Sequence, residues 1–363
     1  MALRKNRFYP PLDPLGWFWI FVFLVTASPT KVPAQAPGVV IEDCLSEKDL
    51  SALLEKALDL KKTGNLTPGN RLKEQLVNPV PGSIQTPSPY STPLDPVLLA
   101  KRAREIRLWI MVLYICPKCS KWHLRDLVSA YPVAPNAVVT CDHAFNRNLK
   151  PEEMPKESYV FVRDAQKRLL GISSVLAANQ VMDAVLLRVD PPNLIPVPLN
   201  DQLAPGDRVF CYSDPLGQLG YFSDGILNRF YWRPERKGEP GSLEEVSYLR
   251  VNFGTDWAPG SSGAPILDQC GNVAGHVSRI SALANSEAKQ NITTEEEKGS
   301  VGRSSISDPP LITVHEGIPA RGVMALIRGV NEQAGATSIK VPPVIPRGPD
   351  LRPRAEDSPS SKP

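Results

Sequence analysis

Between residues 111 and 280 the chain is a series of short apolar runs, and this pattern constrains the fold more than any other feature. The runs are rich in Val, Ile, Leu, Tyr and Phe, and Gly, Pro, Asn or Asp separate them. Such runs are typical of β-strands joined by turns. Since no helical pattern lies between them, they favour an all-β barrel or sandwich. We expect strands near 111–116, 127–134, 137–141, 158–163, 170–176, 182–189, 208–213, 221–230, 246–253, 264–267 and 272–280.

Helices and proline-rich segments flank the β-rich part. Apolar residues at helical spacing predict one helix over 46–63 and another that starts at Asp95-Pro96. Between them, residues 67–96 are expected to form a linker, because prolines and small polar residues break any period. Residues 1–100 hold 13 prolines and residues 340–363 hold 7, so 20 of the 38 lie in the flanks.

The β-rich part is expected to end in an insertion and a helix. Residues 282–312 carry several serines and an acidic triplet, a composition that indicates a long surface loop. A closing helix is expected from Pro319 to about Asn331, and His315 is expected in the irregular stretch before it. The remaining residues, 331–363, are predicted to be a proline-rich disordered tail.

The first 27 residues resemble a secretory signal peptide. They begin with basic residues and continue into an apolar run from Leu15 to Val25, with small residues before a cleavage site after Ala27. The run is shorter than the ~20 apolar residues that span a bilayer, so an uncleaved membrane anchor is the minor alternative. We therefore expect an exported protein, periplasmic or secreted.

The charge balance argues against nucleic acid as a partner. The formal net charge is +3 in 363 residues, and no basic stripe interleaved with aromatic residues is present. With 42% hydrophobic and 22% charged residues, the chain is expected to be globular in bulk. The sequence does not indicate an oligomeric state.

Six cysteines allow three interpretations. They are Cys44, Cys116, Cys119, Cys141, Cys211 and Cys270. In an exported chain they are expected to form disulfides, although the sequence does not select the pairs. Cys116, Cys119 and His123 also have the C-x2-C-x3-H spacing of zinc ligands, with Cys141 or another group as a fourth. Free thiols, with His123 a structural histidine, are the third interpretation.

Three separate segments carry the residue types of nucleophilic catalysis. His143 follows an apolar strand, Asp183 opens another, and Ser262 lies in the turn Gly260-Ser261-Ser262-Gly263-Ala264-Pro265. A serine hydroxyl becomes nucleophilic when an imidazole takes its proton and a carboxylate fixes the imidazole tautomer. Glycines beside the serine let the backbone turn sharply, so that amides can face a developing oxyanion. The sequence therefore predicts a His-Asp-Ser triad.

These segments resemble the trypsin-like serine peptidases, in particular the bacterial Deg/HtrA-type branch. The match rests on the strand before His143, on Asp183-Ala-Val-Leu-Leu, on G-x-S-G-x-P at 260–265, and on Pro205-Gly-Asp-Arg-Val followed by Asp214-Pro-Leu-Gly. The resemblance covers residues 111–330 and implies two six-stranded antiparallel β-barrels with the active site between them. The tail is too short for the peptide-binding PDZ domain that HtrA proteins append. The expected parts are thus a signal peptide (1–27), helices with a linker (28–110), the peptidase domain (111–330) and the tail (331–363).

The resemblance also implies roles for individual residues. Ser262 would be the nucleophile, His143 the general base and Asp183 the orienting carboxylate, with the amides of Gly260 and Ser262 as the oxyanion hole. Three further residues are substrate-binding candidates. Ser278 corresponds to a serine beside the aspartate, Asp256 lies where digestive members carry an acidic specificity residue, and His276 lies on a strand near the cleft. No cofactor or metal is required for this chemistry.

We therefore expect a serine endopeptidase that cleaves protein or peptide substrates through an acyl-enzyme. Two features of the sequence support alternative functions. Cys141 and Asp142 precede His143, where the family has small or aromatic residues, which allows a peptide-binding module of the same fold without turnover. The segment 28–110 allows a latent enzyme whose cleft is covered until processing.

Overall fold

The structure is a computed structural model that describes residues 46–64, 66–145, 155, 157–237, 244–283 and 312–335. The expected signal peptide, most of the insertion and nearly all of the tail lie outside the described residues. Within the described part, every helix is too short or too polar to cross a membrane.

Six antiparallel strands close into a first barrel in the order β1-β2-β3-β6-β5-β4. Because successive side chains of a strand point to opposite faces, one set of apolar residues fills the barrel while the alternate set faces outward. Val138 packs inside with Ile110 and Leu187, whereas its neighbour Val139 packs outside the barrel. The strands are β1 (Leu108–Ile115), β2 (Trp122–Ala134), β3 (Ala137–Thr140), β4 (Ser158–Arg163), β5 (Leu169–Asn179) and β6 (Ala184–Asp190).

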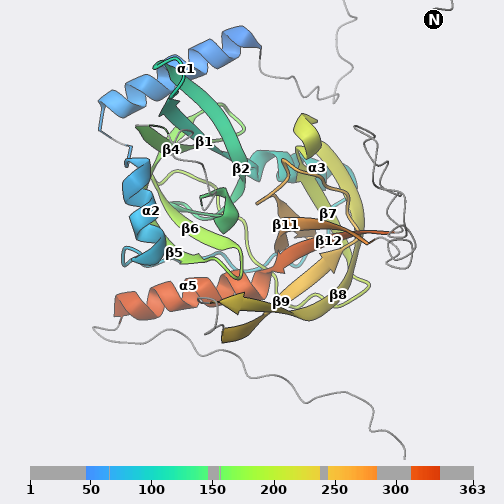
Figure 1. Ribbon diagram of the computed structural model, residues 1–363. Coiled ribbons are helices and arrows are strands. Elements are labelled where there is room, and N and C mark those ends of the chain that lie inside the picture. Colours follow the sequence, from blue (N-terminus) through green and yellow to red (C-terminus); the bar gives the residue numbers. More distant parts are fainter. Residues whose placement is uncertain are drawn as a thin grey trace, which may run out of the picture. The chain divides into compact units, whose positions relative to one another are not determined.

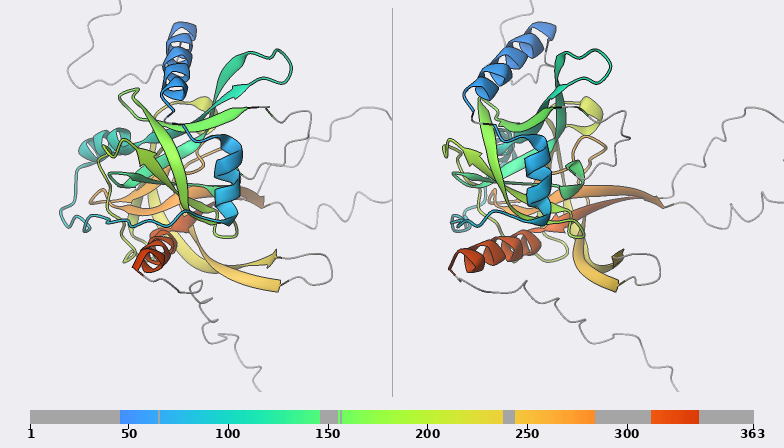
Figure 2. Two further views of the ribbon diagram at one scale, coloured as in Figure 1. Left: turned by 90° about the vertical axis from the view of Figure 1, so that its left-hand side faces the viewer. Right: turned by 60° about the vertical axis from the view of Figure 1, so that its left-hand side comes forward.

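Six more antiparallel strands close into a second barrel in the order β10-β11-β12-β9-β8-β7. Val209, Val251 and Ile266 are fully buried in its core. The paired ends of β8 and β9 continue beyond the barrel as a ribbon (Figure 2). The strands are β7 (Arg208–Ser213), β8 (Tyr221–Lys237), β9 (Glu244–Phe253), β10 (Pro265–Asp268), β11 (Val273–Leu283) and β12 (Ile312–Pro319).

An apolar cluster joins the two barrels. Val139 from the first barrel and Leu267 and Ile318 from the second are buried together, and Val323 and Ile327 of α5 (Ala320–Gly335) pack on them. Helix α5 contacts strands of both barrels and lies along their junction (Figure 1). The predicted architecture of two six-stranded barrels with a C-terminal helix is therefore confirmed.

The amino-terminal segment wraps around the barrels. Helix α1 (Glu47–Lys62) begins at a capping box made by Ser46 and Asp49, and it contacts the first barrel together with α2 (Gly69–Val77). Helix α3 (Pro96–Ile106) contacts β7 of the second barrel. Between α2 and α3 the chain is irregular. The Asn331 side chain holds this segment in place, since its amide oxygen accepts from the Ile84 amide at 2.8 Å and its nitrogen donates to the Ile84 carbonyl at 2.9 Å.

Two elements differ from the sequence prediction. Helix α2 lies in the stretch expected to be a linker, where Pro68 precedes its first turn and Leu72 is fully buried against the first barrel. Strand β12 was not expected, and His315 lies on this strand rather than in an irregular segment. Each strand predicted from the sequence overlaps an observed one.

Candidate active site

Two loops of the first barrel bring His143 and Asp183 together. His143 lies in the short 3₁₀ helix Asp142–Ala144 directly after β3, and Asp183 ends the turn before β6 with a φ of +58°. Since β3 and β6 are paired neighbours, the two loops meet at one end of the barrel. Both carboxylate oxygens of Asp183 lie 3.0 Å from His143 Nδ1, and the backbone amide of His143 donates to Oδ1 at 3.0 Å.

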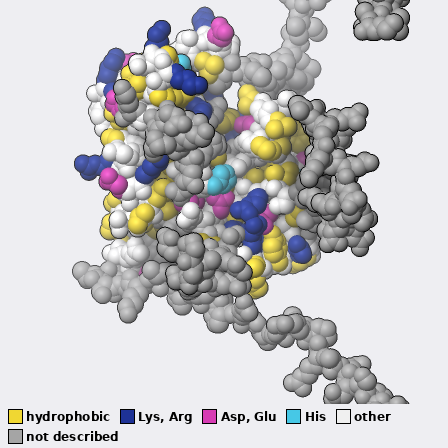
Figure 3. Space-filling model, in the orientation of Figure 1, with side chains coloured by type: hydrophobic (Ala, Val, Ile, Leu, Met, Phe, Trp, Pro, Cys, Tyr) yellow, Lys and Arg dark blue, Asp and Glu magenta, His cyan; other side chains and the backbone are white. Residues whose placement is uncertain are grey.

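Ser262 completes the arrangement from the second barrel. Its Oγ lies 3.1 Å from His143 Nε2. An ionised carboxylate only accepts hydrogen bonds, so Nδ1 of the neutral ring must carry the proton and Nε2 is free to accept from Ser262. The His143 side chain is 43% exposed, so a substrate can reach the ring. Histidine side chains are visible at the surface of the face shown in Figure 3.

Asp183 is held in its ionised form. Burial raises the pKa of this carboxyl, but the hydrogen bond and charge of His143 and the hydroxyl of Ser278 outweigh burial and hold the pKa below its ordinary value. The Ser278 hydroxyl donates to Oδ2 at 2.5 Å. Asp183 can therefore fix the imidazole tautomer at neutral pH and stabilise an imidazolium.

The loop that carries Ser262 is bonded to the first barrel. The amide of Ser129, on β2, donates to the Ser262 carbonyl at 2.8 Å. Gly263 has a φ of +79°, and a Cβ there would lie 2.1 Å from the Ser129 carbonyl oxygen and 2.8 Å from Thr140 Oγ1. Only glycine fits this crossing, which fixes the position of Ser262 against the strand before His143.

The candidate oxyanion-hole amides are available for a ligand. Among the described residues, neither the Gly260 amide nor the Ser262 amide has a hydrogen-bond acceptor. Gly260 has a φ of +107°, and a Cβ there would lie 2.7 Å from the Asp214 carbonyl oxygen. The loop of Asp214 in turn donates from Leu216 to the Pro259 carbonyl at 2.8 Å. This close backbone packing supports the sharp turn that the two amides need to face one point.

The other predicted site residues lie in different surroundings. Ser278 contacts Asp183, as described above. His276 is fully buried beside Asp183, where its Nδ1 lies 3.2 Å from Tyr131 Oη and its Nε2 lies 3.2 Å from the Asp183 carbonyl oxygen. Burial lowers the pKa of His276 to about 4, so this ring is neutral near pH 7. Asp256 is exposed, and its amide bonds the Ser223 hydroxyl at 3.1 Å.

The two unusual residues before His143 are both buried. The Cys141 thiol donates to the Val277 carbonyl at 3.1 Å, and burial raises its pKa well above the ordinary value, so it stays neutral. The Asp142 side chain is also buried, and its carbonyl accepts from Phe145 to close the 3₁₀ turn. Neither contact displaces the His143 ring from Asp183 or Ser262.

Arg250 is a residue that the sequence did not indicate. Its buried guanidinium, on β9, donates to the carbonyl oxygens of Met182 and Val181, at 2.8 and 2.5 Å, and lies 3.5 Å from Glu316. It therefore holds the turn that presents Asp183. The only local signal is an arginine inside an otherwise apolar strand segment, Leu249-Arg250-Val251.

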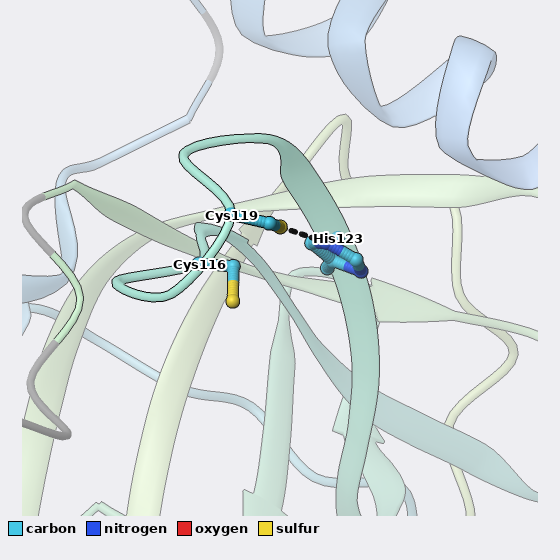
Figure 4. Close-up of side chains that lie close together, drawn as sticks. All are labelled: Cys116, Cys119 and His123. Atoms are coloured by element: carbon cyan, nitrogen blue, oxygen red, sulfur yellow. Dashed lines mark hydrogen bonds between the residues drawn. The ribbon is translucent and has the colours of Figure 1, made fainter.

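The cysteines do not form disulfides in the described part of the chain. Cys116, Cys119, Cys141, Cys211 and Cys270 are all free thiols, and Cys44 lies outside the described residues. Cys116, Cys119 and His123 form one cluster with potential metal ligands (Figure 4). Cys141 is not its fourth member, because it lies with His143 and Asp183 instead.

Comparison with known proteins shows which family part of the chain matches. Residues 129–275 match the family described as trypsin-like peptidase domain, and this range contains His143, Asp183 and Ser262. Curated proteins give no match. Among solved structures, the HtrA-type protease AlgW with decapeptide has 15% identity and a TM-score of 0.44, covering 66% of this chain and 69% of that one. A serine-to-alanine variant of AlgW with decapeptide has 15% identity and a TM-score of 0.43, covering 66% and 67%. The family match confirms the resemblance that the motifs indicate.

Proposed function

We propose that this protein, which matches the trypsin-like peptidase domain over residues 129–275, is a serine endopeptidase that hydrolyses peptide bonds of protein substrates through an acyl-enzyme. The observation that carries the proposal is the continuous hydrogen-bonded series from Asp183 through His143 to Ser262, at 3.0 and 3.1 Å. Distances in this range are those at which a general base can take the proton of its nucleophile.

The acylation step follows from these contacts. Ser262 Oγ attacks the scissile carbonyl carbon while its proton passes to His143 Nε2. The carbonyl oxygen becomes an oxyanion that the amides of Gly260 and Ser262 stabilise. When the C–N bond breaks, His143 gives its proton to the leaving amine, and Asp183 stabilises the imidazolium in between.

Deacylation uses the same groups in reverse. A water molecule gives a proton to His143 Nε2 and its oxygen attacks the acyl carbon. The bond to Ser262 Oγ then breaks, and the serine takes the proton back from His143. Each step conserves protons among water, His143, Ser262 and the substrate, so the chemistry needs no cofactor.

Covalent labelling tests this proposal. The full chain is treated with a fluorophosphonate probe and its intact mass is measured. We expect one label per chain, lost in Ser262→Ala and in His143→Ala. Ser261→Ala is the matched control, because the adjacent Ser261 hydroxyl is buried and has no hydrogen-bond partner among the described residues. This variant should retain the label.

Two outcomes would contradict the proposal. A label that persists in Ser262→Ala would show that another residue reacts. No labelling of the folded wild-type chain, before or after proteolytic trimming of the amino-terminal segment, would favour the peptide-binding module without turnover. Labelling that appears only after trimming would identify a latent enzyme.

We also propose that the chain is exported and loses residues 1–27. The support is the basic start and the apolar run from Leu15 to Val25. Expression of the full gene in a bacterium, fractionation and amino-terminal sequencing test this. A mature protein that begins at Ser28 in the periplasm or medium is expected, whereas an intact chain in the cytoplasm would contradict it.

A further inference from the structure

The turn between β1 and β2 carries three potential metal ligands that the proposed peptidase chemistry does not use. Cys116 and Cys119 lie in the turn, and His123 lies at the start of β2. The turn is closed by hydrogen bonds from the Ser120 amide to the Cys116 carbonyl and from the Cys116 amide to the Lys121 carbonyl, both 2.9 Å. Its backbone is therefore fixed independently of any bound ion.

The three ligand atoms already lie close together. The sulfurs of Cys116 and Cys119 and a ring nitrogen of His123 are all within 4.8 Å of one another. Cys119 points toward His123, with its sulfur 3.1 Å from Nε2 (Figure 4). Tetrahedral zinc with Zn–S of ~2.3 Å and Zn–N of ~2.0–2.1 Å separates its ligand atoms by ~3.6–3.8 Å. Small side-chain rotations would thus bring all three atoms onto one ion.

The surroundings favour negatively charged sulfur. Lys118, Lys121 and Arg125 add positive charge along the same turn and strand. Two thiolates and one neutral imidazole around a divalent ion form a neutral complex, which these cations do not repel.

We propose that Cys116, Cys119 and His123 bind one Zn²⁺ ion at the β1–β2 turn, with water or an external group at the fourth position. The open position follows from the described residues, in which no other Cys, His, Asp or Glu joins the cluster. All three ligands are at least partly exposed, so the ion can enter from solvent.

The site lies where an ion would restrain the contact with α1. Trp122, next to His123, stacks under the ammonium of Lys61 from α1, at 4.6 Å from the ring centroid. Lys61 also pairs with Glu157 at 3.0 Å. An ion bound to His123 would therefore restrain the start of β2, which α1 contacts. The hairpin of β1 and β2 lies beside α1 in the views of Figure 2.

Metal content of the full chain tests the site. The protein is reduced, loaded with zinc, passed through a desalting column, and analysed for zinc by mass spectrometry. Cobalt loading in parallel reports thiolate ligands through charge-transfer absorption. We expect about one ion per chain in the wild type. Cys119→Ser and His123→Ala should lose this ion and the charge-transfer band, while circular dichroism stays unchanged.

Two matched controls locate the ion. Cys270→Ser removes a partly exposed thiol outside the cluster and should keep the ion. His143→Ala removes a ligand of the second possible cluster, made by Cys141, His143 and Asp183, and should also keep it.

Three results of the loading assay would overturn the proposal. They are a reduced wild type that binds no zinc, an ion retained in both Cys119→Ser and His123→Ala, and an ion lost in His143→Ala alone. If the protein purified from its own compartment has lost two hydrogens through a Cys116–Cys119 disulfide and takes up no zinc under that compartment's conditions, the proposal also fails. None of these outcomes depends on whether the chain is a peptidase.

Discussion

Replacing Gly263 by alanine tests how the nucleophile is positioned. The new Cβ would lie 2.1 Å from the Ser129 carbonyl oxygen and 2.8 Å from Thr140 Oγ1. Both atoms belong to strands that are paired with each other in the first barrel, β2 and β3. Relief of the overlap must break the 2.8 Å bond from the Ser129 amide to Ser262 and the 2.7 Å bond from Thr140 to Ser129. The left-handed φ costs ~1–2 kcal/mol, and the two hydrogen bonds cost ~1 kcal/mol each. The expected loss is ~3–4 kcal/mol of unfolding free energy.

The loss of activity should exceed the loss of folded protein. A displacement of Ser262 by about 1 Å reduces the acylation rate by ~100-fold. The rate is measured as fluorophosphonate labelling, and stability by urea denaturation followed by circular dichroism, both on the full chain. The labelling is done under conditions in which the variant is still folded.

Gly206 provides the matched control. It has a φ of +100°, but a Cβ there would meet no atom within 4 Å. Gly206→Ala should therefore cost only the ~1–2 kcal/mol of the backbone conformation and leave the labelling rate unchanged. Equal losses of stability in the two variants, or a Gly263→Ala protein that labels at the wild-type rate, would refute the reasoning.

Three further predictions concern Arg250, His276 and Asp256. Arg250→Lys should slow labelling by up to ~100-fold, because lysine cannot span both carbonyls that hold the Asp183 turn, whereas Arg233→Lys, which perturbs the shared partner Glu316 and neither of these carbonyl contacts, should not. The pKa of His276 is about 4, below the unfolded value of ~6.5, so its contribution to stability is present above pH ~6.5 and lost as the pH falls toward 4. His276→Gln should flatten this part of the stability curve, and an unchanged slope would contradict it. Finally, Asp256→Ala should remove any preference for Arg or Lys before the cleaved bond in a peptide panel, while a panel without such a preference in the wild type would exclude the assignment.

The strands could be predicted where their sequences are locally apolar. The run from Ala184 to Leu187, for example, is buried on both faces and needs no distant partner to be identified. Strand β12 could not be predicted in this way, because Gly317 and Pro319 are typical of turns and Glu316 is charged. Glu316 is buried there because Arg233 and Tyr231 from β8 bond it and Arg250 from β9 adds a second positive charge beside it. Such long-range pairing leaves no local trace in the sequence.

Helix α2 was missed for a related reason. It is nine residues long and starts with Gly69 and Asn70, both poor helix formers. Its stability comes from the burial of Leu72 against the first barrel and from the Gln75 side chain, which accepts from the amide of Val175 on β5 at 2.8 Å. Tertiary contacts override propensity here.

The candidate triad could be proposed from motifs, but what holds it together could not. His143, Asp183 and Ser262 each lie in a recognisable local segment. The bonds that align them run between the barrels, from Ser129 to Ser262 and from Ser278 to Asp183. Their partners are far apart in the chain, so no window of sequence contains both.

These bonds between the barrels imply that the candidate site is disrupted before the barrels unfold. Asp183 and His143 belong to the first barrel, but Arg250, His276 and Ser278 of the second barrel hold Asp183 in place. A small separation of the barrels would therefore break the contacts of Asp183 before either barrel core is exposed. It follows that mild denaturant should abolish labelling of Ser262 below the concentration at which circular dichroism reports unfolding. Coincident loss of labelling and of secondary structure would show instead that the two barrels and the site unfold as one unit.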